Sequence, residues 1–207
     1  MLATLLTIWL LHVAALLSPG ANVLLVSQLA ASDRGKSALF AAFGVTLGAL
    51  LWATFAVLGV HAVFGAFPGL RFGLQVLGGA YLLYVATRLW RSTGPELGKP
   101  APAISRSTAF RLGFLTNITN PKSALFFGSV FAASFPAEPG VALQISAVAI
   151  IVVNALCWHT LLAYLFSRPR VRAGYARSRN TANRVASALL GVLGLGLLVS
   201  TFREARL

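Results

Sequence analysis

The chain has 207 residues, of which 57% are hydrophobic and 10% are charged, and its formal net charge is +13. About a quarter of the residues of an ordinary globular domain are charged, and a single core of this size cannot bury so much apolar surface. The composition therefore excludes a soluble globular protein. The positive charge does not indicate a nucleic-acid partner, because the basic residues lie between long apolar runs and form no continuous basic face.

Six apolar segments follow one another, and each is close to the ~20 residues that cross a bilayer as a helix. In chain order they span residues 2–31, 37–60, 72–89, 112–135, 141–166 and 185–202. A secretory signal requires Lys or Arg ahead of its apolar stretch, and none precedes the first segment. The sequence therefore predicts an all-α polytopic membrane protein with six transmembrane helices, the first of them long and broken.

Two of these predicted helices contain a proline among small and amide residues. The interruptions are Leu17–Asn22 in the first helix and Asn117–Ser123 in the fourth. Proline lacks a backbone N–H group and displaces the carbonyl group four residues earlier. In lipid, the freed polar groups must be satisfied by protein, water or a ligand. We therefore predict that helices 1 and 4 are broken at Pro19 and Pro121; ordinary proline kinks filled by neighbouring side chains are the alternative.

A stretch with Gly, Pro and Ser at residues 93–107 is the one plausible linker, and it separates a repeat of about 1–92 from one of about 108–207. We expect both repeats to belong to a single transmembrane domain, residues 1–207. Because each repeat has three helices, the second enters the membrane in the opposite direction to the first. Interrupted helices at matching positions of inverted repeats mark the substrate site of transporters, so transport is the leading predicted function.

Lysine and arginine gather in alternate loops. The loops after the first, third and fifth segments carry thirteen of them, counting Arg88 at the end of the third segment, and the other two loops carry only Arg71. Because basic loops stay in the cytoplasm, both termini are predicted to lie outside. The stretch 168–184 is expected to be a loop that sets the topology and touches anionic lipid.

The predicted substrate-binding residues are those at the two breaks: Pro19, Gly20, Asn22, Asn117, Asn120, Pro121 and Lys122. The half-helix after each break directs a partly positive N-terminus into the opening, which suits a carboxylate. An ammonium group deep in an apolar segment costs about 2.5–3.5 kcal/mol on insertion scales. We therefore assign Lys122 to the substrate carboxylate; the alternative is that its side chain snorkels to the surface.

The predicted helices contain no carboxylate in their apolar interior. The acidic residues lie in loops or near the C-terminus: Asp33, Glu96, Glu138 and Glu204. Proton coupling would therefore use Lys122, a histidine or the substrate itself. His159 is the candidate proton-coupling residue, with a hydrogen-bonded packing role as the alternative; His12 is a weaker candidate. Without a membrane carboxylate to meet a second cationic group, the predicted substrate is neutral.

Three motifs, taken in order, resemble those of the lysine-exporter (LysE/RhtB) family of bacterial amino-acid efflux proteins. They are Ser18–Asn22, Gly78–Tyr84, and Gly113–Asn117 leading to Asn120–Lys122. The family usually has Pro-Gly-Pro-Asn in the first motif, whereas this chain has Ala21 in place of the second proline. The resemblance covers essentially the whole chain. It implies export of small amino acids or their derivatives by a multi-pass protein of the bacterial inner membrane.

An exporter or channel for inorganic cations is the alternative function. It is disfavoured by the lack of intramembrane carboxylates, cysteine pairs and histidine clusters, so no metal or cofactor is expected. The lone Cys157 cannot form an intramolecular disulfide and is expected to be a small buried hydrophobe. No Ser/His/Asp set or phosphate-binding loop indicates an enzyme or an ATPase. The expected partners are an amino-acid-like solute and lipid, and a homodimer is left open.

Single cysteines in a Cys157→Ala background test the predicted topology. The basic loops place Ser92 and Ser178 in the cytoplasm and Ala137 outside. We expect an impermeant thiol reagent to label Ala137→Cys in intact cells, and to label Ser92→Cys and Ser178→Cys only after permeabilisation. Labelling of the latter two but not of Ala137→Cys would overturn the topology.

Overall fold

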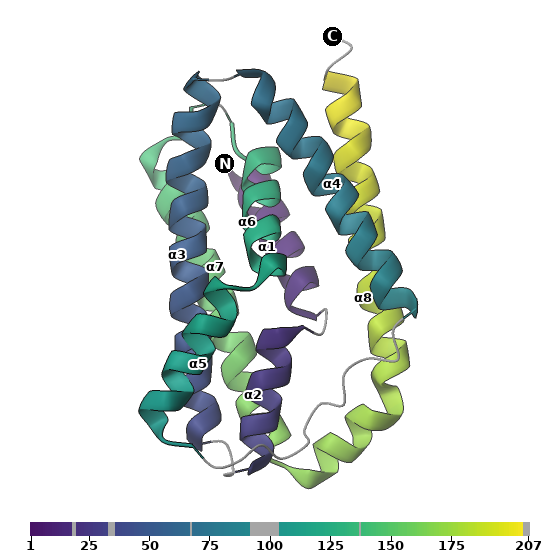
Figure 1. Cartoon of the computed structure of the whole chain (residues 1–207). Helices are drawn as coiled ribbons and strands as arrows, with labels where there is room; N and C mark the ends of the chain where they lie inside the picture. Colours follow the sequence, from purple (N-terminus) through teal and green to yellow (C-terminus); the bar gives the residue numbers. More distant parts are fainter. Residues whose placement is uncertain (18–19, 33–35, 67, 92–103, 137, 205–207) are drawn as a thin grey trace.

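A computed structural model describes residues 1–17, 20–32, 36–66, 68–91, 104–136 and 138–204. These residues form helices and no strand, as the predicted all-α class requires (Figure 1). The helices of the described part are α1 (Leu2–Leu17), α2 (Ala21–Ser32), α3 (Lys36–Ala66), α4 (Pro68–Arg91), α5 (Arg106–Ile118), α6 (Pro121–Ser134), α7 (Val141–Phe166) and α8 (Pro169–Glu204).

The first and the fourth predicted segments each contain two helices. The axes of α1 and α2 are inclined by 55°, and Pro19 lies outside the described residues. Between α5 and α6, Asn120 adopts an extended conformation, and its side-chain Oδ1 accepts a hydrogen bond of 2.9 Å from the Lys122 N–H. Pro121 follows as the first residue of α6, where an N–H group would have no intrahelical partner. An N-cap followed by proline therefore starts a new helix at this point.

Two stretches of the described residues are long and apolar enough to cross a membrane as single helices: Lys36–Gly59 and Val141–Phe166. The bent pair α1 and α2 adds a third span if it is counted as one. The other helices are shorter or carry more polar residues. The arrangement of six transmembrane helices in two inverted repeats thus stays a prediction.

Two predicted loop regions were wrong. Residues 168–184 were expected to form a loop, but α8 begins at Pro169 and continues through this basic stretch. Arg106 and Arg111, assigned to the loop after the third segment, lie in α5. Arginine is a good helix former, so a charged stretch can prolong a membrane helix beyond the hydrocarbon. Most of the predicted linker, residues 92–103, lies outside the described residues.

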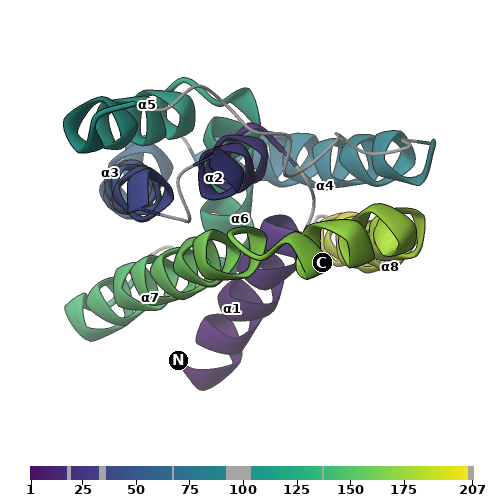
Figure 2. The same ribbon diagram turned by 90° about the horizontal axis from the view of Figure 1, so that it is seen from below.

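The two interrupted helix pairs run in opposite directions along the bundle, and both interruptions lie about halfway along it (Figure 1). Each pair packs against a long helix of the other half of the chain, α5 against α3 and α1 and α2 against α7. Seen from below, α2 lies among α3, α5 and α7, while α4 and α8 lie side by side (Figure 2). The two halves are therefore interleaved.

Two separate apolar clusters fill the bundle, one on each side of the interruptions. The first is built mainly from α1, α3, α6 and α7 and contains four buried phenylalanines of α6 and its C-cap: Phe126, Phe127, Phe131 and Phe135. The second is built from α2, α3, α5 and α7 around side chains such as Val26 and Val45, which are 0% exposed. The polar residues of the two breaks lie between these clusters.

Small residues bring the helices of the two halves into close contact. A Cβ atom on Gly113 of α5 would overlap the Ala41 carbonyl group of α3, and one on Gly48 would lie 2.8 Å from the Asn117 side chain. Between α4 and α8, a Cβ on Gly79 would lie 3.1 Å from the Gly194 carbonyl oxygen. Such contacts are the usual role of glycine between membrane helices.

Cys157 is exposed on the surface of α7, so the expectation that it is buried was wrong. The apolar run that surrounds it in the sequence belongs to α7. In the most apolar stretch of this helix, only 22% is buried inside the protein. In a membrane, apolar side chains also face lipid. An apolar neighbourhood in the sequence therefore does not imply burial in the protein core.

Substituting Gly113 by alanine tests the contact between α3 and α5. We expect Gly113→Ala to destabilise the protein by about 1–3 kcal/mol, the usual cost of overpacking, because the new methyl group meets backbone. Gly128→Ala in α6 is the matched control, since nothing lies within 4 Å of its added Cβ. Thermal unfolding in detergent should show a lower midpoint for Gly113→Ala only. Equal midpoints would contradict the close contact.

Candidate functional site

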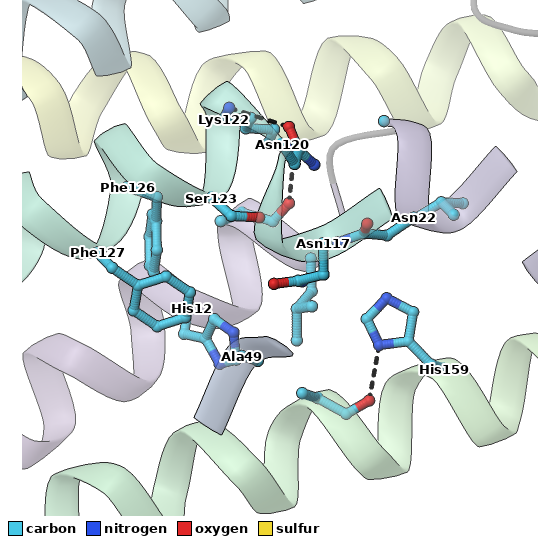
Figure 3. A pocket seen from close by; sticks show the side chains of 15 residues that line it. His12, Asn22, Ala49, Asn117, Asn120, Lys122, Ser123, Phe126, Phe127 and His159 are labelled. Carbon is cyan, nitrogen blue, oxygen red and sulfur yellow. Dashed lines mark hydrogen bonds between the residues drawn. The ribbon is translucent and has the colours of Figure 1, made fainter. Parts of the chain in front are cut away.

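A cavity of about 60 Å³ lies at the level of the two interruptions. Its walls come from α1, α2, α3, α5, α6 and α7, and from Gly20 and Asn120, which precede α2 and α6 (Figure 3). This space is large enough to hold ordered water. Its lining combines polar side chains with apolar ones.

Most of the predicted substrate-binding residues line this cavity: Gly20, Asn22, Asn117, Asn120 and Lys122. Pro19 lies outside the described residues, and Pro121 is placed only as the first residue of α6. The two histidines singled out in the sequence also line the cavity. The structure therefore brings segments about a hundred residues apart in the chain into one site.

Three cavity residues of α6 were missed by the sequence reasoning. Ser123, Phe126 and Phe127 follow Lys122 and line the same cavity. Residues four apart lie on one face of a helix, so the position of Lys122 could have indicated Phe126. Ser123 and Phe127 each lie one residue further on and share that face in part.

At the first break, the amine of Lys122 satisfies a carbonyl group that proline leaves without its helical donor. The carbonyl of residue i in an α-helix accepts from the N–H of residue i+4, and the fourth residue after Ala15 is Pro19, which has none. The Lys122 Nζ donates a hydrogen bond of 3.0 Å to the Ala15 carbonyl oxygen. The lysine side chain thus reaches from α6 to α1 inside the bundle.

The second break repeats the arrangement with another donor. Pro121 deprives the Asn117 carbonyl of its helical partner in the same way. The indole Nε1 of Trp52, on α3, donates to this oxygen at 3.3 Å, and the Asn120 N–H donates at 3.1 Å. At each break, therefore, a side chain from another helix supplies a donor to the carbonyl that proline left unpaired.

Three polar side-chain atoms at the cavity are buried without a hydrogen-bond partner in the described structure. They are His12 Nδ1, Asn22 Oδ1 and Asn117 Oδ1. An unsatisfied buried polar atom costs about 1–3 kcal/mol. Such atoms at one cavity indicate that a polar ligand or water completes the site.

His159 lies on the α7 wall and is 2% exposed. Its Nδ1 is 2.8 Å from the Ala155 carbonyl oxygen. Since a carbonyl oxygen only accepts, Nδ1 carries the proton, and in the neutral ring Nε2 is the acceptor nitrogen. The hydrogen bond fixes the tautomer and the orientation of the ring.

The apolar wall consists of aromatic rings. The imidazole of His12 lies 5.7 Å from the ring centroid of Phe126 and 6.0 Å from that of Phe127. The two phenyl rings meet edge to face at 5.3 Å. This packing gives the cavity an aromatic side.

The site has the chemistry for binding a small molecule of mixed polarity. It offers an ammonium donor in Lys122, amide oxygens in Asn22 and Asn117, and the aromatic wall. The described lining residues include no aspartate or glutamate. In the part of the chain that the structure describes, no group of three His, Cys, Asp or Glu residues could hold a metal ion.

Comparison with known proteins gives consistent matches over nearly the whole chain. A family model described as LysE type translocator matches residues 13–201. The threonine efflux protein of Escherichia coli (strain K12) is 34% identical over 205 residues, covering 97% of this chain and 100% of that protein. The threonine efflux protein of Salmonella typhi is 33% identical over 205 residues, with coverage of 97% and 100%. The leucine efflux protein of Salmonella choleraesuis (strain SC-B67) is 26% identical over 185 residues, 87% of this chain and 85% of that protein. No solved structure matches the chain.

Proposed function

The chain belongs to the LysE type translocator family, and on that premise we propose that it exports small neutral amino acids or their derivatives from the cytoplasm. The family match confirms the resemblance found in the sequence. It also identifies the chain as a multi-pass membrane transporter rather than an enzyme. The substrate, the direction and the site are our proposal.

The observation that carries the proposal is the pairing of one ammonium donor with unpartnered amide oxygens in a buried cavity. A substrate carboxylate accepts from the Lys122 amine, and the substrate ammonium donates to the Oδ1 atoms of Asn22 and Asn117, which lack partners. A small side chain then lies against Phe126 and Phe127. Every charged group of an amino acid thereby meets a group of opposite polarity.

Neutrality of the substrate side chain is supported by the lining. A second cationic group would find no carboxylate among the described lining residues, and leaving it uncompensated away from water costs several kcal/mol. The relatives named as threonine and leucine efflux proteins are named for amino acids with uncharged side chains. The alternative function, transport of inorganic cations, gains no support from the site.

The position of the site supports alternating access. The cavity lies between two apolar clusters, one on each side of the interruptions. Transport then requires each cluster to open in turn, and binding of the carboxylate to Lys122 competes with the link between Lys122 and Ala15. Since no nucleotide-binding loop occurs in the sequence, an ion or substrate gradient supplies the energy.

We also propose the inverted-repeat topology in the bacterial inner membrane. Two observations support this topology. The two interrupted helix pairs run in opposite directions, and each pair packs against a long helix of the other half of the chain. The starts of α3, α5 and α8, with Lys36, Arg106 and Arg170, lie at the same end of the bundle (Figure 1). Arginine–aromatic contacts such as Arg106 over Phe40 also lie there. This basic end faces the cytoplasm and its anionic lipids.

Efflux from preloaded cells tests the function directly. We expect cells that contain the protein to release labelled threonine and leucine faster than cells without it, and to release lysine no faster than the control. The physical reason is the free-energy cost of a second, uncompensated charge in the site. Each 1.4 kcal/mol of that cost lowers the affinity tenfold. Lysine leaving fastest would refute the charge argument, and no release of any amino acid would refute the function.

Lys122→Met tests the assigned carboxylate contact. Without the ammonium group we expect efflux to fall at least tenfold, while the amount of membrane-inserted protein is unchanged. Lys122→Arg should restore little, because a planar guanidinium does not replace a compact ammonium. Lys36→Met is the matched control, since Lys36 is exposed at the start of α3. Normal transport by Lys122→Met would exclude the assignment.

A further inference from the structure

We propose that the groove between α3 and α7 binds one anionic phospholipid, with an acyl chain between the two helices and the phosphate group at Lys36 and Arg168. The groove lies on the outer surface of the bundle, and its lining shares no residue with that of the substrate cavity. The inference therefore concerns a second binding site. It does not depend on which substrate the protein transports.

The groove is apolar along most of its length and has a volume of about 910 Å³. Its walls come from both helices and include Leu39, Phe43, Leu156, Cys157, Leu161 and Tyr164. Leu39, Phe43, Leu161 and Tyr164 are large side chains that are each at least 37% exposed. In a chain that crosses the membrane, such a surface is covered by lipid tails or by another protein.

The length of the groove matches one leaflet of a bilayer. Along α7 its lining runs from Leu156 to Ser167, which is about 16 Å at the helical rise of ~1.5 Å per residue. The hydrocarbon core of a bilayer is about 30 Å thick, so one leaflet contributes about 15 Å. An acyl chain that enters at the level of Ser167 therefore follows the groove to the middle of the bilayer.

The end of the groove at Ser167 carries two cationic side chains. Lys36, the first residue of α3, lines the groove, and Arg168 is exposed directly after Ser167. The guanidinium carbon of Arg168 lies 4.1 Å from the centre of the Tyr164 ring, and its Nη2 donates a hydrogen bond to the Tyr164 hydroxyl. Because a guanidinium has five N–H donors, this bond leaves others for phosphate oxygens. Charge-assisted bonds from arginine and lysine are the usual way in which proteins hold a phosphate.

The charges favour a lipid over a second copy of the chain. The acidic residues of the described part are Glu138, which precedes α7, and Glu204, which ends α8, both at the end of the bundle opposite Lys36 (Figure 1). Two copies meeting at this groove about a twofold axis would place the same surface against itself. Lys36 and Arg168 would then face their own copies, with no described carboxylate between them. An anionic phosphate group compensates both cations instead.

A lipid in this groove also joins the two halves of the protein, because α3 belongs to the first half and α7 to the second. A ligand that binds the folded state alone stabilises it. Added anionic lipid is therefore expected to raise the thermal unfolding midpoint of the purified protein, whereas a zwitterionic lipid with the same acyl chains is not.

Native mass spectrometry of the purified full-length protein tests the site. At equal concentrations of phosphatidylglycerol and phosphatidylcholine with identical acyl chains, we expect at least tenfold more bound phosphatidylglycerol, because the two cations bind its phosphate with no ammonium group of the lipid to compete. Equal binding of the two lipids, or an equal effect of both on the unfolding midpoint, would overturn the proposal.

Variants of the two cations locate the headgroup. In Lys36→Gln/Arg168→Gln we expect the ratio of bound phosphatidylglycerol to phosphatidylcholine to fall to about one. Arg106→Gln is the matched control, because Arg106 is exposed at the same basic end but belongs to α5, on the side of α3 opposite α7 (Figure 2). None of these residues lines the substrate cavity. The same fall in Arg106→Gln would show a general effect of surface charge and would contradict a local site.

The single cysteine of the chain tests what occupies the apolar part of the groove. Cys157→Trp fills the groove without changing its charge, so we expect it to reduce phosphatidylglycerol binding at least fivefold. Leu195→Trp, at an exposed position of α8 (57% exposed), is the control and should bind the lipid normally. In vesicles, the unaltered protein should form no disulfide-linked dimer under mild oxidation. Rapid cross-linking of two chains through Cys157 would place a second copy in the groove and overturn the proposal, as would normal lipid binding by Cys157→Trp.

Discussion

The hydrogen bond from the Lys122 amine to the Ala15 carbonyl oxygen is the contact on which the rest of the site depends. Its acceptor exists because Pro19 has no N–H group to offer that oxygen, and hydrocarbon supplies no substitute. The contact brings the end of α1 next to the start of α6, and with them Gly20 and Asn22. A Cβ on Gly20 would lie 3.8 Å from the lysine Nζ, so the residue just before α2 lies beside the amine. A carbonyl group at the end of α1 is thus paired with the amine of a lysine in α6.

The second break places its polar groups by packing instead of by charge. Trp52 donates to the Asn117 carbonyl oxygen, and the absence of a side chain at Gly48 leaves room for the Asn117 amide. Both residues belong to α3, which forms the long support of α5. The amide oxygen of Asn117 is consequently directed into the cavity without a partner of its own. The geometry of the site therefore comes from helices that contribute few of its functional groups.

A site residue could be predicted from the sequence when its effect is confined to its own helix, and could not when its contacts form only between helices far apart in the chain. The residues around Pro19 and Pro121 could be singled out because proline acts on its own helix, and a lysine inside an apolar segment is conspicuous. Trp52 and Phe127 could not, because their contacts arise only when distant helices pack. The exposure of Cys157 was misjudged since lipid and protein core select the same apolar residues. The basic stretch of α8 was taken for a loop because charge marks the edge of the hydrocarbon but does not end a helix.

The interleaving of the halves has a consequence for the order in which the chain can assemble. The face of α3 that contains Gly44 and Gly48 is covered by α5, a helix that is synthesised roughly sixty residues later. Until α5 has inserted, this face of α3 lies against lipid tails. Lipid tails fill the space left by the two glycines less well than a complementary helix does. Neither half has its full set of neighbours alone. Assembly is therefore completed only when the second half reaches the membrane, and a chain interrupted between the halves would leave two partners that must find each other laterally.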